Sequence, residues 1–453
     1  MPVRRKRQNN PIGFALIVKT RGLSVPALLW DQNLFEMYRL LLIFLLLVFQ
    51  LPVFAAQILV PMDNTQRNHL KAYGIAYHVL TYDVEISWLL NYRGGSFMFD
   101  HHREFEEELL VRGVSYQVIA DVQAAAILRE IAEPDVNMDE IRLHKVPRIA
   151  VYSPPNSLPW DDAVTLALTY SEIPYDVVYD EEVLSGVLPL YDWLHLHHED
   201  FTGQFGKFWF AYRNNDWYQQ DVRLAQETAR RLGYSKVSHL KLAVAKKIRD
   251  FVAGGGYMFA MCSAPESIDI ALAAEGVDIL HEVYDGDPVE PGAQEKLDFS
   301  RTFAFQNFTV ITDPTIYEKS NIDVPKSGRD RRTDFFTLFE FSAKWDVVPT
   351  MLTQNHESVV RGFMGQTTAF RYDFIKPSVT ILGETRAKNE ARYIHGSLGN
   401  GTFTFMGGHD PEDYQHFVGD PPTDLNLYPN SPGYRLILNN VLFPAARKQP
   451  QKT

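Results

Sequence analysis

The 453-residue chain is 45% hydrophobic and 13% aromatic, and its formal net charge is −12 at pH 7. An apolar fraction of this size provides for a large core and excludes wholesale disorder. The acidic balance argues against nucleic acid as a partner, because phosphate binding needs a basic surface. The one cysteine, Cys262, cannot form an intrachain disulfide. The length corresponds to two or three domains.

An apolar run near the N-terminus, residues 40–49, reads LLLIFLLLVF. Ten residues are too few for a free bilayer-spanning helix, which needs about 20, but they fit the h-region of a signal peptide. The following VFA fits the small-x-small cleavage rule, so we expect cleavage before Ala56. Met37 is then the expected start of translation, and the residues before it are an extension. Residues 1–55 are therefore predicted to be removed.

Export follows from this interpretation, and it predicts a periplasmic or secreted protein with no stable membrane insertion after cleavage. The alternative is an uncleaved signal anchor, with the RRKR of residues 4–7 on the cytoplasmic side.

Residues 56–145 alternate between helical and strand patterns. Apolar residues recur at helical spacing over residues 68–80, and a strand pattern follows over residues 85–92. The next stretch predicts a helix, a glycine stop and a strand up to about residue 120, and then a further helix to residue 132. We expect an N-terminal α/β segment, which is either a small domain or an extension of the main sheet.

Residues 146–453 have the rhythm of an open parallel sheet. Strands are predicted near residues 147–154, 175–184, 191–203 and 257–263, and helices over residues 161–173, 237–252 and 266–276. This order predicts an α/β, flavodoxin-like open parallel sheet with helices on both faces. Functional residues in such sheets lie at the carboxyl edge of the strands.

Two stretches interrupt this pattern and are predicted to be insertions. Residues 201–237 include GQFGKFWFAYRNNDWYQQ, whose aromatic and amide residues suit either a lid or substrate wall, or ordinary loop packing. Residues 279–346 are rich in proline, glycine and charge, and are expected to be surface strands and loops. Further strands are expected near residues 337–345, 362–372 and 378–384, then at GTFTFM, with a final packing helix near the C-terminus.

Cys262 lies at the end of an apolar strand and just before a helix, in the context AMCSA. A nucleophile elbow needs small residues two positions before and two after the nucleophile, and Ala260 and Ala264 meet that need. A helix N-terminus favours the thiolate, and its N–H groups, near Ser263, could hold an oxyanion. The alternative is a small buried side chain, which is common for free cysteines.

His409 is the best-placed base among the 14 histidines, because it follows a strand and a glycine pair in FTFMGGHDPEDY. Asp410, Glu412 or Asp413 could orient its second ring nitrogen. The alternative is a loop-capping His-Asp pair.

The run HLHHED, residues 195–200, follows another predicted strand. His197, His198, Glu199 and Asp200 are therefore candidates for substrate or oxyanion contact. A metal site of His195, His197 and His409, with Cys262 as bystander, is a third interpretation, although no ligand spacing is diagnostic. We expect no metal and no cofactor. The pair at residues 161–162 is expected to cap a helix.

Taken together, AMCSA and GGHDPE resemble the class I glutamine amidotransferase-like superfamily from Pro147 to about Asp413. YDWLHLHHEDFTG and GNGTFTFMGGHDPEDY resemble its trehalose-utilisation (ThuA-like) branch, and the whole chain is similar to exported bacterial proteins that automated naming calls asparagine synthetase B. The resemblance implies a flavodoxin-like fold, a cysteine nucleophile and a histidine base, with glutamine as the default substrate. Asparagine synthesis is not implied, because the chain lacks an S-G-G-x-D-S loop and an N-terminal cysteine.

Two departures from the superfamily pattern are visible. Both glycines of the G-x-C-x-G elbow are alanines here, and the acids after His409 stand at one and three residues rather than two. The leading hypothesis is an exported amide or acyl hydrolase acting on a small molecule, glycan or peptide. The rival is a non-catalytic carbohydrate- or peptide-binding module. Its groove would be formed by the HLHHED loop with Trp209, Tyr212, Trp217 and Tyr218.

Overall fold

The structure is a computed structural model that describes residue 39 and residues 56–156, 160–324, 329–415 and 417–447. The predicted signal peptide thus lies, apart from Arg39, outside the described residues. Residues 55–453 form one compact unit. Within the described ranges, no helix combines the length and the apolar character that crossing a bilayer requires.

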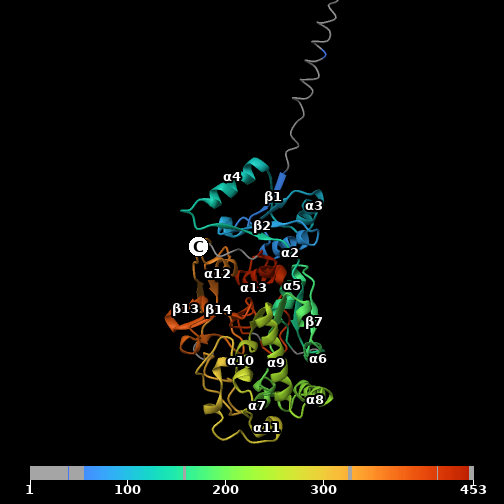
Figure 1. The fold of residues 1–453 in the computed structure, drawn as a ribbon, viewed down its shortest axis with the longest axis vertical. Helices are drawn as coiled ribbons and strands as arrows, with labels where there is room; N and C mark the ends of the chain where they lie inside the picture. The colour runs from blue at the N-terminus through green and yellow to red at the C-terminus, as the bar shows by residue number, and fades with distance from the viewer. Residues whose placement is uncertain (1–38, 40–55, 157–159, 325–328, 416, 448–453) are drawn as a thin grey trace, which may run out of the picture. The chain divides into compact units, whose positions relative to one another are not determined.

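The N-terminal segment is built on a five-stranded antiparallel sheet of order β4-β1-β3-β2-β5. Its strands are β1 (Ala56–Val60), β2 (Ile86–Leu90), β3 (Ser96–Asp100), β4 (Gln117–Ala120) and β5 (Asp139–Leu143). Its helices are α2 (His69–Leu80), α3 (Arg103–Val111) and α4 (Asp121–Ala132) (Figure 1). The sequence predicted the three helices, β2 and β4, and it missed β1, β3 and β5.

The main sheet has ten strands and is mixed, so the prediction of an all-parallel sheet is wrong for half of it. Its order is β11-β10-β13-β14-β15-β9-β8-β6-β7, with β12 paired to β14. The parallel strands are β6 (Ile149–Tyr152), β7 (Asp176–Val178), β8 (Trp193–Leu196), β9 (Tyr257–Met261) and β15 (Gly401–Met406). The antiparallel strands are β10 (Phe335–Leu338), β11 (Val359–Arg361), β12 (Phe370–Arg371), β13 (Thr380–Thr385) and β14 (Glu390–Leu398).

The change of direction occurs at a tight hairpin between β14 and β15. Only Gly399 and Asn400 separate the two strands, and a parallel connection needs a crossover of a dozen or more residues. Gly399 has a φ of 60°, and a Cβ there would lie 2.5 Å from the carbonyl oxygen of Ala253. Glycine is therefore required at this turn both by its backbone conformation and by its neighbour.

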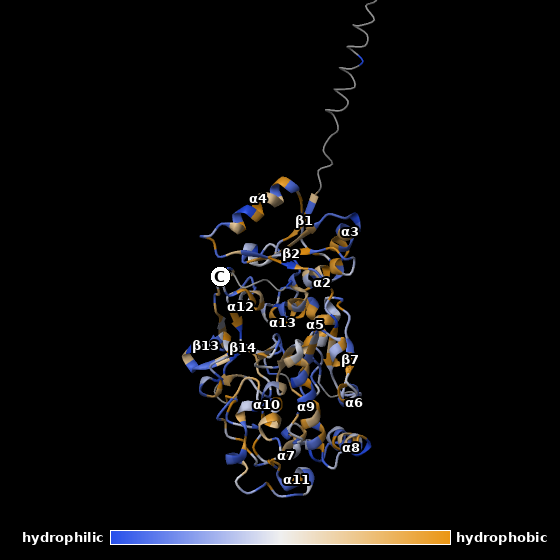
Figure 2. Cartoon of the chain, in the orientation of Figure 1, coloured by the Kyte–Doolittle hydropathy of each residue, from blue (hydrophilic) through white to orange (hydrophobic). Residues whose placement is uncertain are grey.

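Helices cover both faces of the parallel part of the sheet, as predicted. Alternate residues of β9 enter two different cores, because strand side chains alternate between faces. Phe259 and Met261 pack in one core with α5 (Ala163–Tyr170) and α13 (Pro432–Leu442). Met258 and Ala260 pack in the other with α9 (Val237–Gly254) and α10 (Ala264–Ala273). The hydrophobic stretches of α5 and α13 appear orange in Figure 2.

The first core also includes residues of both sheets, so the N-terminal segment packs directly on the main sheet. Tyr73 of α2 donates a hydrogen bond to Asn439 of α13. Arg435 of α13 is fully buried and donates to the carbonyl oxygens of Met62 and Gly94.

The two predicted insertions differ in regularity. Residues 201–237 include α7 (Trp209–Tyr212) and the 16-residue α8 (Asp216–Arg231), which the loop expectation missed. Residues 279–346 are mostly irregular, as expected, with α11 (Glu282–Asp285) and β10 as their helix and strand. The remaining α-helices of the described ranges are α6 (Asp180–Ser185) and α12 (Val347–Leu352).

Candidate functional site

The candidate site lies at the carboxyl edge of the parallel strands. Loops that follow β6, β8, β9 and β15, which are neighbours in the sheet, bring their side chains to one pocket of about 340 Å³. Parallel strands present their carboxyl ends at the same edge, so residues far apart in the sequence meet there. The residues lining the pocket include Trp160, His198, Phe208, Tyr212, Cys262, Tyr317, Gln366 and His409.

Cys262 occupies the turn between β9 and α10 with a φ of 53°. A left-handed backbone conformation is uncommon for a residue other than glycine, and it tends to mark functional sites. The turn is held by a hydrogen bond from the Cys262 N–H to the carbonyl oxygen of Gly408, 3.0 Å away. The side chain is 5% exposed, and its Sγ accepts a hydrogen bond from the N–H of Gln366 at 3.4 Å.

The loop after β15 and the loop of residues 363–368 approach very closely beside Cys262. The His409 N–H donates to the carbonyl oxygen of Met364 at 3.0 Å. A Cβ on Gly365 would lie 2.7 Å from the carbonyl carbon of Gly408 and 2.8 Å from the nitrogen of His409. Because both neighbours are backbone atoms, only glycine fits at position 365 without moving His409.

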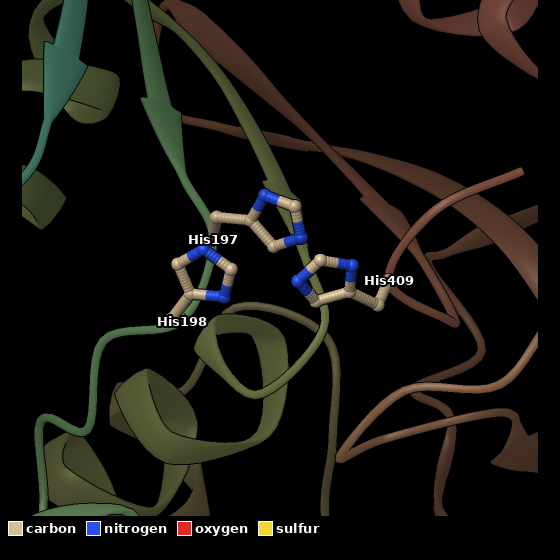
Figure 3. A group of neighbouring side chains, drawn as sticks. All are labelled: His197, His198 and His409. Atoms are coloured by element: carbon tan, nitrogen blue, oxygen red, sulfur yellow. The ribbon is translucent and has the colours of Figure 1, made fainter. Parts of the chain in front are cut away.

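Three histidine rings converge at this edge, as Figure 3 shows for His197, His198 and His409. The rings of His197 and His198 are stacked with centroids 4.1 Å apart, and the ring of His409 lies 4.6 Å from the first and 4.9 Å from the second. If β8 continued, strand alternation would place His197 and His198 on opposite faces. The strand ends at Leu196, and the turn that follows brings His198 back beside His197.

Asp162 fixes the inner side of this cluster. Its Oδ2 lies 3.1 Å from Nε2 of His195 and 3.2 Å from Nδ1 of His197. It also caps α5 by accepting from the N–H groups of Val164 and Thr165, as the sequence predicted for this pair of acids. Burial raises the pKa of its carboxyl group, but the two histidines and these contacts outweigh that effect and hold the pKa well below its ordinary value.

Two of the predicted contact residues hold the loop that follows β8. The Glu199 carboxylate accepts from the N–H of His197 at 3.0 Å, and burial raises its pKa to about 7. The Asp200 carboxylate accepts from the N–H groups of Thr202 and Gly206. Both line a smaller adjacent pocket of about 70 Å³, which His198 also borders.

Ser263 holds the same loop from the other side. Its hydroxyl donates to the carbonyl oxygen of His198 at 2.8 Å, and the N–H of Ala264 donates to that of His197. The loop thus presents carbonyl oxygens to the start of α10. These two carbonyl oxygens are engaged by α10, and the expectation that the loop assists oxyanion binding stays a prediction.

The acids after His409 support the loop they belong to. The Asp410 carboxylate is fully buried and accepts hydrogen bonds from the hydroxyl groups of Thr423 and Tyr434 and from the N–H of Glu412. Burial raises the pKa of Glu412, and a hydrogen bond from Ser431 opposes the rise. The role of either acid in orienting His409 stays a prediction.

Aromatic side chains form one wall of the pocket. The ring of Trp160 lies 5.6 Å from Phe208 and 5.4 Å from Trp217, and Tyr212 lies 5.2 Å from Trp217. Of the four aromatic residues predicted to form a groove, only some therefore belong to this pocket. Tyr212 lines the pocket and Trp217 supports it, whereas Trp209 and Tyr218 are absent from its lining.

Sequence reasoning missed three features of the site. Asp162 was predicted only as a helix cap, yet its carboxylate also contacts two histidines. Gln366 was predicted within a strand, but the segment is a loop whose N–H reaches Cys262. Tyr317 comes from the irregular insertion, where no periodic signal exists to place it.

The third interpretation was a metal site of His195, His197 and His409, and the structure indicates a different set of histidines. Among the described residues, His197, His198 and His409 each offer one ligand atom within 4.8 Å of the others, and His195 groups instead with Asp162 and His197. Three imidazoles suit zinc and related transition metals. The site thus brings together a thiol, three imidazoles and an aromatic wall.

Comparisons with known proteins do not assign the chain to a family. No protein-family model and no curated protein matches the chain. Two solved cytoplasmic proteins of Salmonella typhimurium are similar at 10% and 11% identity, each with a TM-score of 0.32, over 67% and 66% of this chain and 100% and 99% of theirs. A beta-galactosidase from Bacillus circulans sp. alkalophilus is similar at 11% identity and a TM-score of 0.27, over 58% of this chain and 28% of that enzyme. TM-scores this low support no inference about function.

Proposed function

We propose that this protein is a cysteine-dependent hydrolase of an amide or related acyl bond, with Cys262 as nucleophile and His409 as base. The observation that carries the proposal is the left-handed turn at Cys262, between β9 and α10, in a pocket that His409 also lines. A nucleophile elbow uses this kind of strained strand-to-helix turn to present the reactive atom.

The strand order supports a flavodoxin-like assignment for the parallel part of the sheet. Numbered along the chain, the parallel strands β6, β7, β8, β9 and β15 have the spatial order 2-1-3-4-5. That is the order of flavodoxin-like folds, whose sites lie at the carboxyl edge of the strands. We propose on this basis, and on the sequence resemblance, that the domain is class I glutamine amidotransferase-like with ThuA-like features.

The proposed reaction has two steps. His409 takes the proton of the Cys262 thiol, and the thiolate attacks the acyl carbon. A C–S bond forms, the C–N bond breaks, and the amine leaves with the proton that His409 took. Water then gives a proton to His409 and attacks the thioester, which releases the carboxylic acid and restores the thiol. We propose two N–H groups as the oxyanion donors. The N–H of Gln366 lies 3.4 Å from the Cys262 sulfur, and Ser263 is the next residue along the chain.

The test is alkylation of the native protein with iodoacetamide at neutral pH, followed by intact-mass measurement. The chain has one cysteine, so any adduct reports on Cys262, and Cys262→Ala serves as the blank. We expect rapid labelling of the folded protein and slower labelling of His409→Gln. Labelling that requires unfolding would refute the nucleophile assignment.

The second candidate is a carbohydrate- or peptide-binding module, which the aromatic wall of Trp160, Phe208 and Tyr212 favours. Aromatic faces bind sugars and peptide side chains without any nucleophile. Saturable binding of a glycan or peptide that is unchanged in Cys262→Ala, with no product formed, would favour this candidate over the hydrolase.

We also propose that the protein is exported and processed before Ala56. Support comes from the apolar h-region and the cleavage pattern in the sequence. N-terminal sequencing of the secreted protein is expected to begin at Ala56, and retention of residues 1–55 would contradict export by cleavage.

A further inference from the structure

We propose that His197, His198 and His409 bind one divalent transition-metal ion of the zinc class. One ring nitrogen of each lies within 4.8 Å of the other two, and the rings face a shared space (Figure 3). Zinc–imidazole bonds of about 2.0–2.1 Å in a tetrahedral site separate the nitrogens by about 3.3 Å. Metal binding therefore requires the ring nitrogens to approach one another by up to about 1.5 Å.

The burial of His197 is the second observation that points to a ligand. The residue is 0% exposed, and in the part of the chain that the structure describes neither ring nitrogen has a partner in hydrogen-bond geometry. Nδ1 lies 3.2 Å from Oδ2 of Asp162, whereas Nε2 has no such charged neighbour among the described ion pairs. A buried polar nitrogen without a partner costs free energy, and native proteins rarely leave one so. A metal ion at the cluster would give Nε2 the partner it lacks.

Asp162 supplies the outer support that metal-binding histidines usually have. A carboxylate beside Nδ1 fixes the ring tautomer, so that Nε2 carries the lone pair, and it raises the basicity of the ligand. Asp162 is itself held by the N–H groups of Val164 and Thr165 at the start of α5, so its position is rigid. The arrangement is a carboxylate–histidine pair aimed at the space between the three rings.

Coordination by three histidines would leave a position open toward the pocket. His198 and His409 both line the pocket, as do Cys262 and Gln366. Three protein ligands with a free fourth position are typical of catalytic rather than structural zinc sites, where four protein ligands close the shell. The open position would face the thiol or a bound small molecule.

A second group of possible ligands, Asp278, Asp285 and Asp287, lacks this property. The Nζ of Lys236 lies 2.7, 2.8 and 2.7 Å from their carboxylate oxygens, so a cation of the protein already fills that site. The histidine cluster differs in that the charged group beside His197 is the Asp162 carboxylate, 3.2 Å from its Nδ1, which favours a bound cation.

The metal site has a consequence for catalysis, which rests on the proposed hydrolase function. A His409 nitrogen that binds metal cannot transfer a proton, so the hydrolase would work in the metal-free form and zinc would inhibit it. Metal binding itself does not require Cys262 to be a nucleophile.

The experiment is a titration of the metal-stripped, purified chain with Co²⁺, read by visible d–d absorption, and then with Zn²⁺ as competitor. We expect one Co²⁺ per chain and its displacement by Zn²⁺. His198→Gln is expected to lose saturable binding. His198 is only half-buried, so the change disturbs packing little.

Asp162→Asn tests the support without removing a ligand. Asparagine caps a helix as well as aspartate does, so α5 is retained, while affinity is expected to fall about 10- to 100-fold. The exposed His144→Gln is the matched control and should bind as the unaltered protein does. Circular dichroism confirms that each variant is folded.

Absence of saturable Co²⁺ binding by the unaltered protein would overturn the proposal. So would Co²⁺ affinities of His198→Gln and Asp162→Asn that equal the affinity of the unaltered protein. The failure of the hydrolase is a separate result, because Cys262→Ala is expected to bind Co²⁺ with the same stoichiometry.

Discussion

Two pairs of stacked histidines among the described residues have nearly identical ring geometry and opposite electrostatic surroundings. His69 and His356 have centroids 4.0 Å apart and His197 and His198 4.1 Å apart, each pair at an interplanar angle of 11°. The first pair lies beside the Arg435 guanidinium, and the second beside the Asp162 carboxylate.

The neighbouring charge decides what each pair can do. Burial, followed by repulsion from Arg435, lowers the pKa of His69 to about 4. Burial and the charges of His69 and Arg435 lower the pKa of His356 to about 3. These rings are therefore neutral packing elements where α2 meets α13. In the pair beside Asp162, His198 instead borders a pocket, so stacking alone does not identify a functional histidine.

The largest expected change in stability follows from replacing Arg435, the residue beside the first histidine pair. Arg435→Met removes the hydrogen bonds to Met62 and Gly94. The Met62 carbonyl oxygen then keeps only its contact with the His69 ring, and the Gly94 carbonyl oxygen loses the donor it has in Arg435. We expect the free energy of unfolding to fall by about 3–5 kcal/mol, measured by urea denaturation.

The exposed Arg447, paired with Glu85, gives the matched control, and Arg447→Met should cost less than about 1 kcal/mol. A small loss in Arg435→Met would contradict the structural role of the first pair.

The pH dependence of stability sharpens the same comparison. His69 and His356 have folded pKa values below the ordinary 6.5, so the unfolded chain binds more protons than the folded chain between about pH 4 and 6.5. Stability is therefore lost as the pH falls through this window. Each histidine contributes up to about 1.4 kcal/mol per pH unit, and less for the partly exposed His356.

Urea denaturation at a series of pH values checks this, with the double variant His69→Gln, His356→Gln as control. We expect a flatter profile for the variant, and an unchanged slope would show that other groups cause the loss.

The smallest expected effect concerns the second pair and its loop. Gly365→Ala places a Cβ against the backbone of Gly408 and His409, so the loop must move. We expect a loss of about 1–3 kcal/mol in the free energy of unfolding and slower alkylation of Cys262.

Gly254→Ala is the control, because a Cβ there meets no atom within 4 Å. Equal behaviour of the two variants would mean that the close approach at Gly365 does not position the site.

Local sequence patterns predicted many of the helices and strands. The helices α2, α9, α10 and α13 follow from apolar spacing, and the strands β8, β9 and β15 from short apolar runs that end in polar loops. The mixed main sheet could not be derived, because β14 was not recognised and strand direction depends on partners distant in sequence. The helix α8 was missed because the aromatic and amide residues at its start suggested a lid or loop.

The site was partly predictable for a physical reason. Cys262, His198 and His409 follow parallel strands, and the carboxyl ends of such strands share one edge. The stacking of His197 on His198 depends on where β8 ends, and the contact of Asp162 with His197 depends on tertiary packing. Neither leaves a periodic signal in the sequence.

Trapping an acyl intermediate tests the central claim most directly. The metal-free protein is incubated with an activated acyl ester and its intact mass is measured. The account predicts one acyl group per chain, located on Cys262, with slower formation in His409→Gln by about 10²- to 10⁴-fold. An adduct that also forms on Cys262→Ala, or no adduct on the native protein, would contradict it.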